Sequence, residues 1–265
     1  MNDTPVGFRQ GCFYRFQLLL RRNKMDERTI RAGMLLGTEA MDKLRHSHVA
    51  VLGLGGVGSW CAEGLARCGV GKLTLMDEDT VSLSNTNRQL CALSSTQGMS
   101  KAEVLAARIR DINPAIHVRP ITGRYEAASR EVFFAGGYDF VVDAIDLVSC
   151  KVDLILSCRE RGIPIISALG TGNKLDAQQL RISDIAKTSG CALARVVRKE
   201  LRSRGVNHHP VVFSPEEPTP AEQWEAPPPG RRSIPGSLVW VPATAGMLLC
   251  QYVVTELVKN EAPGE

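Results

Sequence analysis

The sequence lacks the long apolar segment that marks an integral membrane protein. No stretch of the 265-residue chain reaches the roughly 18 consecutive apolar residues that a membrane-spanning helix needs. The apolar run near the start is too short, and too closely flanked by arginines, to resemble a secretory signal with a cleavage site. We therefore expect a cytoplasmic protein with no membrane partner.

Closely paired cysteines are also absent. The eight cysteines lie at positions 12, 61, 68, 91, 150, 158, 191 and 250, and no two of them are separated by only two residues. Such pairs are the usual signature of a structural zinc site. We therefore expect no structural zinc, and we interpret the cysteines as buried, reduced thiols.

Charge of one sign is not strongly in excess. The net charge is +4 and the isoelectric point is near 8.6, which permits a nucleic-acid partner without indicating one. With 44% hydrophobic residues the chain is long enough to bury a sizeable core. A regular pattern begins only after Met25. We expect residues 1–24 to be a poorly ordered, dispensable extension and residues 25–265 to form one domain.

Apolar runs alternate with helical patterns along most of this domain. The alternation predicts an α/β fold of Rossmann type, in which a mostly parallel sheet has helices on both faces. The predicted strands are 48–53, 72–77, 116–121, 139–144 and 164–168, with a further strand at 180–184. The predicted helices are 57–68, 101–112, 127–134, 150–161, 192–204 and 241–258, preceded by two helical patterns over 27–45. Residues 215–236 are expected to form a long loop.

A glycine-rich turn joins the first predicted strand to a helix. Gly53, Gly55, Gly56 and Gly58 give the turn its pattern, and the next strand ends in Asp77. Glycines allow close approach of phosphate to backbone N–H groups, and the acid can accept hydrogen bonds from a ribose. The pattern predicts a nucleotide site, and at this point NAD and ATP remain equally possible.

The residues after Asp77 favour ATP. Asp79, Asn85 and Arg88 follow in a polar segment, and Lys101 begins the next predicted helix. Arginine and lysine beside a nucleotide turn suit a triphosphate and the charge that develops during phosphoryl transfer, whereas hydride transfer needs no such cluster. The alternative is a solvated polar loop with an unrelated lysine.

These motifs together resemble the ubiquitin-activating-type adenylyltransferase superfamily, over roughly residues 27–185. The resemblance implies that Asp77, Asn85, Arg88 and Lys101 contact ATP and that Asp146 binds Mg²⁺. It also implies a homodimer in which Arg31 reaches the triphosphate of the partner subunit. Without the resemblance, Asp146 could equally cap the helix that follows it, and Arg31 would be a surface arginine.

In such enzymes a carboxylate attacks the α-phosphorus of ATP and pyrophosphate leaves. Fixed cations and a metal stabilise the charge that accumulates. Activators of small carrier proteins in this superfamily usually hold zinc with two C-x-x-C pairs, and some have a further domain around a catalytic cysteine. This sequence has neither feature. Adenylation of the C-terminal glycine of a small ubiquitin-like sulfur carrier therefore stays as the alternative function.

The second half resembles one subfamily, the tRNA threonylcarbamoyladenosine dehydratases, with similarity from about Met25 to Val258. The residues that carry it lie at 170–176, 183–188, 195–205 and 231–237. The resemblance implies adenylation of the threonyl carboxylate beside the anticodon, followed by cyclisation on the base's own carbamoyl group with release of AMP. Because cyclisation is intramolecular, proximity replaces a cysteine nucleophile. Some members carry a cysteine where Val211 and Val212 stand, so a sulfur-relay role is not expected.

A basic helical stripe gives independent but weaker support for a tRNA partner. Its side chains recur at helical spacing and could follow a line of phosphates. The alternative is a solvated helix face. The candidate tRNA-binding residues are Lys187, Arg195, Arg198, Lys199, Arg202 and Arg204. A third possibility for the whole chain, an inactive nucleotide-binding scaffold, is disfavoured by the complete set of site residues.

Overall fold

A seven-stranded sheet forms the centre of the protein. The computed structural model describes residues 26–224, 226–227 and 233–259. The strand order is β3-β2-β1-β4-β5-β7-β6, and every neighbouring pair is parallel except β6 and β7. The strands are β1 (His48–Leu52), β2 (Lys72–Asp77), β3 (His117–Thr122), β4 (Phe140–Asp143), β5 (Ile165–Ala168), β6 (Arg181–Asp184) and β7 (Pro210–Phe213).

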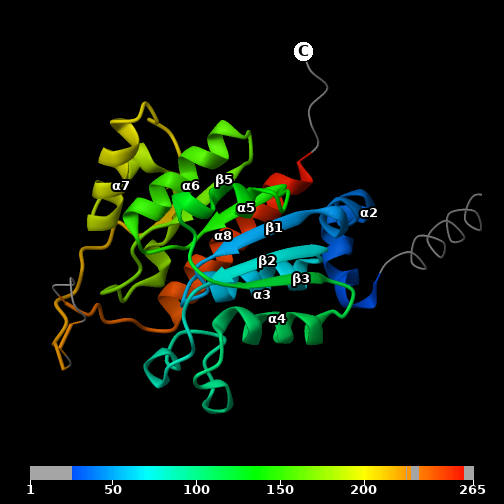
Figure 1. The fold of residues 1–265 in the computed structure, drawn as a ribbon, viewed down its shortest axis with the longest axis horizontal. Helices are drawn as coiled ribbons and strands as arrows, with labels where there is room; N and C mark the ends of the chain where they lie inside the picture. Colours follow the sequence, from blue (N-terminus) through cyan, green and yellow to red (C-terminus); the bar gives the residue numbers. More distant parts are fainter. Residues whose placement is uncertain (1–25, 225, 228–232, 260–265) are drawn as a thin grey trace, which may run out of the picture.

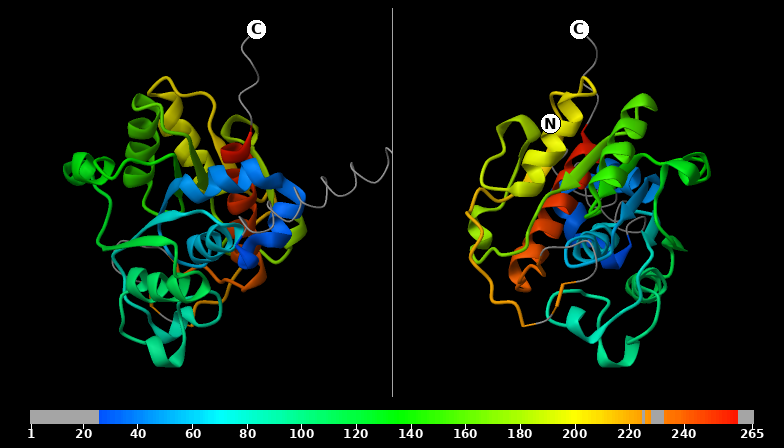
Figure 2. Two further views of the ribbon diagram at one scale, coloured as in Figure 1. Left: turned by 90° about the vertical axis from the view of Figure 1, so that its right-hand side faces the viewer. Right: turned by 60° about the vertical axis from the view of Figure 1, so that its left-hand side comes forward.

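Helices cover both faces of the sheet, as Figures 1 and 2 show. Four helices pack with the first core cluster and three with the second. On the first face lie α2 (Ile30–His46), α3 (Gly58–Cys68), α4 (Lys101–Ile112) and α8 (Trp240–Val258). On the second lie α5 (Arg130–Phe134), α6 (Val148–Glu160) and α7 (Ala192–Arg202).

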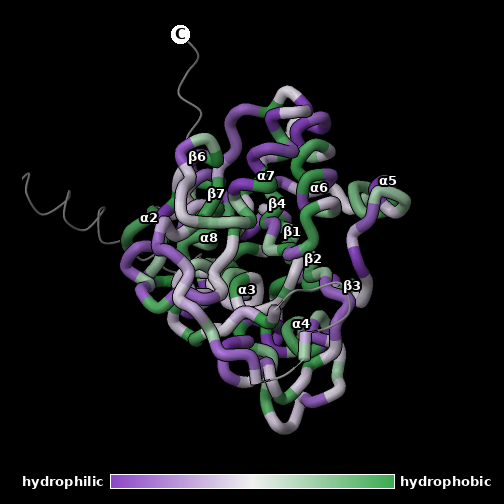
Figure 3. The backbone as a smooth tube through the Cα atoms, turned by 90° about the vertical axis from the view of Figure 1, so that its left-hand side faces the viewer, coloured by the Kyte–Doolittle hydropathy of each residue, from purple (hydrophilic) through white to green (hydrophobic). Residues whose placement is uncertain are grey.

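Alternate side chains of β1 enter the two cores. Val49 and Val51 belong to the cluster under α3 and α8, whereas Ala50 and Leu52 belong to the cluster under α6. All four are buried. A strand that is covered on both faces needs apolar residues at every position, which explains why β1 reads as a continuous apolar run. Figure 3 shows hydrophobic residues concentrated in the strands and α8.

The predicted α/β class is confirmed, and most predicted elements agree with the structure to within two residues. The 127–134 segment divides into η4 (Ala127–Ser129) and α5, and the two patterns over 27–45 become η1 (Glu27–Thr29) and α2, kinked at Gly37. The strand β7 was not predicted. It consists of only four residues between two loops, and its parallel pairing with β5 is a long-range contact that no local pattern indicates. The predicted extension at 1–24 lies outside the described residues.

The apolar helix α8 passes a length and composition test for a membrane span. In the fold it packs closely on α3 and the sheet, with eight of its residues buried, as expected for a core helix. Two glycines allow this approach. A β-carbon on Gly246 would lie 2.4 Å from the carbonyl oxygen of Val57, and one on Gly64 would lie 2.8 Å from the Cys250 sulfur.

The Gly246 contact gives a stability prediction. Gly246→Ala should lower the free energy of unfolding by about 1–3 kcal/mol, because the added methyl forces α8 away from α3. Urea denaturation followed by circular dichroism measures the change. Gly123→Ala is the matched control, since a β-carbon there meets nothing within 4 Å, and it should stay within about 0.5 kcal/mol of the parent protein. Equal stability of the two variants would contradict the packing role of Gly246.

Candidate active site

The glycine turn lies where the sheet order changes direction. β1 has β2 on one side and β4 on the other. The carboxyl ends of these strands, which we call the crevice, are the usual ligand position in such sheets. Gly53 has a φ of 84°, and a β-carbon there would lie 2.4 Å from the Ala144 carbonyl oxygen. A β-carbon on Gly58 would lie 1.8 Å from the Gly53 carbonyl oxygen. These two glycines therefore bring β1, β4 and α3 together.

The two middle glycines leave bare backbone at the surface of the crevice. A β-carbon on Gly55 would meet only the Gln89 amide nitrogen, at 3.8 Å, and one on Gly56 would contact Pro242 at 3.1 Å and Arg88 at 3.4 Å. The turn leads directly into the N-terminus of α3. Exposed N–H groups and the helix dipole at such a place suit an anionic group such as a phosphate.

Asp77, at the end of β2, is tied to the glycine turn. One of its carboxylate oxygens accepts from the Leu54 N–H at 2.6 Å and the other from the Asp79 N–H at 2.8 Å. Burial raises the pKa of Asp77, while these two N–H groups act against the rise. A half-buried carboxylate held in this orientation is suited to accept from ribose hydroxyls, as the sequence predicts.

Lys101 and Asp79 form an ion pair next to Asp77. The Lys101 ammonium lies 2.8 Å from the Asp79 carboxylate, and its side chain is only 6% exposed against 62% for Asp79. The pair connects the start of α4 to the loop after β2. A buried ammonium on the edge of the crevice can exchange this surface carboxylate for a phosphate group.

Arg88 and Asp146 approach the same turn from different strands. Arg88 packs beside Gly56 and donates to the Ser84 carbonyl oxygen and the Asn87 side chain, both at 2.8 Å. Burial lowers the pKa of Arg88, and the nearby charge of Asp146 opposes that shift. An arginine remains charged under such a perturbation. The two side chains therefore place opposite charges at the crevice.

Asp146 itself is exposed and does not cap the helix that follows. The N-cap of α6 is Leu147, so the capping alternative is wrong. Within the described ranges, Asp146 makes no hydrogen bond or ion pair, and no group of three or more potential metal ligands occurs. A single free carboxylate fits Mg²⁺, which commonly takes one or two protein carboxylates together with phosphate oxygens.

Two amides complete the loop between β2 and α4. Asn85 is a predicted ATP contact. Its side-chain oxygen accepts from the Ser82 N–H at 3.2 Å and so stabilises its own loop. Gln89 was not among the predicted site residues. Among the described residues its buried side-chain oxygen has no hydrogen-bond partner, and its amide nitrogen lies over Gly55. This acceptor at the glycine turn can accept from a ligand or from water.

Arg31 lies at the opposite end of α3 from the glycine turn. Thr29, two residues earlier, lies within 3.2 Å of a β-carbon built on Gly69, the residue that ends α3. An 11-residue helix separates the two places, a distance of roughly 16 Å. In Figure 1, α2 correspondingly lies at the far end of the sheet from the loops of the site.

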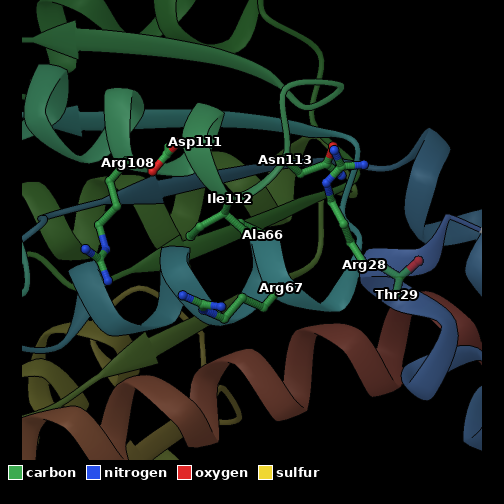
Figure 4. A pocket seen from close by; sticks show the side chains of 8 residues that line it. All are labelled: Arg28, Thr29, Ala66, Arg67, Arg108, Asp111, Ile112 and Asn113. Atoms are coloured by element: carbon green, nitrogen blue, oxygen red, sulfur yellow. The ribbon is translucent and has the colours of Figure 1, made fainter.

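A cavity of about 460 Å³ also lies at this far end, between the C-terminal turns of α3 and α4 (Figure 4). Three arginines line it, but each pairs with a carboxylate of the chain. Arg67 and Arg108 share the buried Glu63, and Arg28 pairs with Asp26. The cavity therefore does not coincide with the predicted nucleotide site.

The predicted tRNA-binding residues divide into two groups. Arg198 is half-buried and donates to the Thr188 and Ile185 carbonyl oxygens, and Arg204 pairs with Glu200 at 2.7 Å. These two arginines stabilise their own region. The other four are exposed and, within the described ranges, make no ion pair: Lys187, Arg195, Lys199 and Arg202.

Comparisons with known proteins show the family of the chain. The ThiF family matches residues 27–262. The chain is 41% identical over 236 residues to the tRNA threonylcarbamoyladenosine dehydratase of Bacillus subtilis, covering 86% of this chain and 93% of the relative. Crystal structures of the Escherichia coli tRNA N6-threonylcarbamoyladenosine dehydratase with ATP and with AMP both align at a TM-score of 0.79. The ATP complex is 36% identical over 87% of this chain and 93% of that chain, and the AMP complex 35% identical over 87% and 94%.

A buried polar cluster beneath the site was not predicted from the sequence. Asp143, at the end of β4, and Lys151, on α6, are both fully buried and lie 2.7 Å apart. Lys151 also donates to the Ala168 carbonyl oxygen at 2.9 Å. Ser167 and His209 are hydrogen-bonded at 2.8 Å. The Asp143 carboxylate accepts in addition from the Ile145 N–H at 3.0 Å, so the cluster fixes the backbone that leads to Asp146.

His209 gives this cluster a measurable pH dependence. Burial, with the nearby Lys151 charge, lowers the pKa of His209 from 6.5 to about 3. The unfolded chain therefore binds a proton that the folded chain does not, and the free energy of unfolding should fall as pH drops below 6.5. Between that pH and about pH 5 the loss should be about 1.6 kcal/mol. Urea denaturation at several pH values measures it.

His209→Asn is the control for this prediction, because it removes the titrating ring and leaves a side chain that can still hydrogen-bond to Ser167. Burial also lowers the pKa of His48, so the difference in slope between the parent protein and the variant is the informative quantity. Equal slopes over this pH range would contradict a neutral, buried His209.

Proposed function

Since the chain belongs to the ThiF family, we propose that it is an ATP-dependent tRNA threonylcarbamoyladenosine dehydratase. The observation that carries the proposal is the 41% identity to a dehydratase over most of both chains, and the predicted residues Asp77, Arg88 and Lys101 near the glycine turn support it. The threonyl carboxylate attacks the α-phosphorus of ATP, and the bond to the pyrophosphate breaks. The carbamoyl group then attacks the acyl carbon and AMP leaves, so the nucleoside loses one water overall.

The residues around the turn have distinct roles in this proposal. The N–H groups of the turn and the start of α3 bind phosphate, and Asp77 accepts from the ribose. Lys101 leaves Asp79 to contact the triphosphate, and Arg88 neutralises charge as pyrophosphate departs. Asp146 would hold Mg²⁺, which supplies charge neutralisation at the phosphates. Asn85 and Gln89 offer amide groups to the nucleotide.

No covalent nucleophile is required. Cys91 is the cysteine beside Lys101, yet it is 1% exposed, and burial raises its pKa. A buried thiol with a raised pKa is a poor nucleophile. Its surroundings therefore favour direct cyclisation over a thioester intermediate, and they favour the tRNA substrate over a carrier protein that needs sulfur transfer.

A homodimer in which Arg31 acts on the partner subunit completes the proposal. Arg31 is exposed and separated from its own glycine turn by the length of α3, which supports a role in the site of a second subunit. Next to it on α2, Met34 is 75% exposed and Leu35 is 89% exposed. Neighbouring exposed apolar side chains of this size are typical of an interface. The four exposed cations Lys187, Arg195, Lys199 and Arg202 would bind tRNA phosphates in the cytoplasm.

The reaction is tested by incubating the protein with ATP, magnesium and threonylcarbamoyladenosine-containing tRNA. Mass spectrometry of the nucleosides should show loss of one water, together with AMP and pyrophosphate. Lys101→Ala should lower kcat by about 10²–10³, the usual effect of removing one charge-stabilising group. Lys199→Ala should instead weaken tRNA binding and reduce its salt dependence. AMP formation with a small carrier protein, and no mass change in the tRNA, would overturn the proposal.

The role of Arg31 is tested by mixing two inactive variants. Arg31→Ala and Arg88→Ala should each be inactive alone, because each homodimer lacks one cation in both sites. A hybrid dimer has one site with both cations, so random mixing at equal concentrations should restore up to about a quarter of parental activity. Mixing each variant with more of itself is the control. No recovery in hybrids that are shown to form would contradict the action of Arg31 on the partner subunit.

A further inference from the structure

A segment that we call the strap, residues 233–242, crosses the mouth of the crevice. On one side the Ser237 carbonyl oxygen accepts from the Asn87 side chain at 2.9 Å, next to Arg88. On the other side Gly236 and Asn173 exchange two hydrogen bonds, of 2.6 and 2.8 Å. The strap therefore joins the loop after β2 to the loop after β5.

Trp240 lies at the end of the strap and is the first residue of α8. Its indole N–H donates to the Leu175 carbonyl oxygen at 2.8 Å, which fixes the ring. The side chain is nevertheless 50% exposed. Two residues later, Pro242 packs on Gly56 of the glycine turn. A large aromatic ring is thus held rigidly, half in solvent, close to the nucleotide site.

The order of strands indicates which ligand this ring faces. Asp77 ends β2, the glycine turn follows β1, Asp146 follows β4, and Leu175 follows β5. Along this edge the ribose position comes first, the phosphates next, and the Leu175 loop with Trp240 last. The ring therefore lies across the glycine turn from Asp77, away from the proposed position of the ATP ribose.

We propose that Trp240 is a stacking platform for a base of the tRNA anticodon loop, and that it positions the substrate carboxylate at the α-phosphate. The proposal rests on the tRNA dehydratase function argued above. Proteins recognise unpaired RNA bases by stacking them on aromatic rings. A ring fixed before the RNA arrives loses little conformational freedom on binding, and an indole offers the largest such surface among side chains.

Trp224 provides an internal comparison. It is 89% exposed, and its indole N–H donates to Glu222, only two residues away. Within the part of the chain that the structure describes, no hydrogen bond joins its ring to the loops of the site, in contrast to Trp240. Trp224 therefore serves as the matched control for effects on the KM for tRNA that follow from removing any exposed tryptophan.

Two substitutions of Trp240 separate stacking from simple apolar contact. Trp240→Phe and Trp240→Leu both lose the bond to Leu175, but only phenylalanine keeps an aromatic face. With threonylcarbamoyladenosine-containing tRNA, the leucine variant should raise the KM for tRNA roughly 5- to 100-fold, the usual range for loss of one stacked base. The phenylalanine variant should stay within about threefold of the parent, and the KM for ATP should stay within about threefold in both.

Trp224→Leu should leave the KM for tRNA within about threefold of the parent, and thermal denaturation establishes that all three variants are folded. Equal KM values for tRNA in the phenylalanine and leucine variants would overturn the stacking role. So would an increase in the KM for ATP as large as that for tRNA. A parent protein that leaves the tRNA unchanged would instead overturn the proposed function, so the two failures are distinguishable.

Discussion

The site depends on one close approach of backbone to backbone, where Gly53 meets the Ala144 carbonyl oxygen at the crossing point of the sheet. A β-carbon on Gly53 would lie 2.4 Å from that oxygen, which is too close for any side chain. The positive φ of 84° also favours glycine at this position. This contact sets the glycine turn against the end of β4, which brings Asp146 and Arg88 to the same crevice. The buried pair of Asp143 and Lys151 supports it from below, since Asp143 also holds the Ile145 N–H. Removing one partner of such a pair would cost several kcal/mol, because the other charge would remain buried alone.

Much of the fold could be predicted from the sequence, because parallel strands covered on both faces are continuous apolar runs. β2 and α4 were predicted with their observed limits, Lys72–Asp77 and Lys101–Ile112. The failures occur where local pattern carries little information. β7 has four residues and is identified as a strand only by its neighbours β5 and β6. The two helical patterns over 27–45, by contrast, agree with the structure, because α2 is interrupted at the non-helical Gly37.

The candidate site also contains residues that the local sequence pattern predicts and residues that it does not. Asp77, Arg88 and Lys101 lie on one continuous segment after the turn, so their spacing along the chain predicts the shared location in which the structure places them. Gln89, Lys151 and His209 could not be predicted, because their roles come from burial and from partners far away in the sequence. Helical spacing groups Arg198 with the candidate tRNA-binding residues, and in the structure its guanidinium donates to carbonyl oxygens of the preceding segment. Spacing identifies which residues share a face of a helix, but it does not show which of their side chains are hydrogen-bonded within the protein.

In the absence of a ligand, the Lys101 ammonium in the crevice is already paired with the Asp79 carboxylate. Within one described chain the crevice brings together three carboxylates, of Asp77, Asp79 and Asp146, and two cations, of Arg88 and Lys101. Its formal charge is therefore slightly negative before any ligand arrives, and such a surface does not attract a free polyanion. A positive charge supplied from outside the chain, by a counterion that accompanies the nucleotide or by the proposed arginine of a second subunit, would offset this excess. In the proposed dimer, ATP would therefore be held more strongly by paired subunits than by a solitary one.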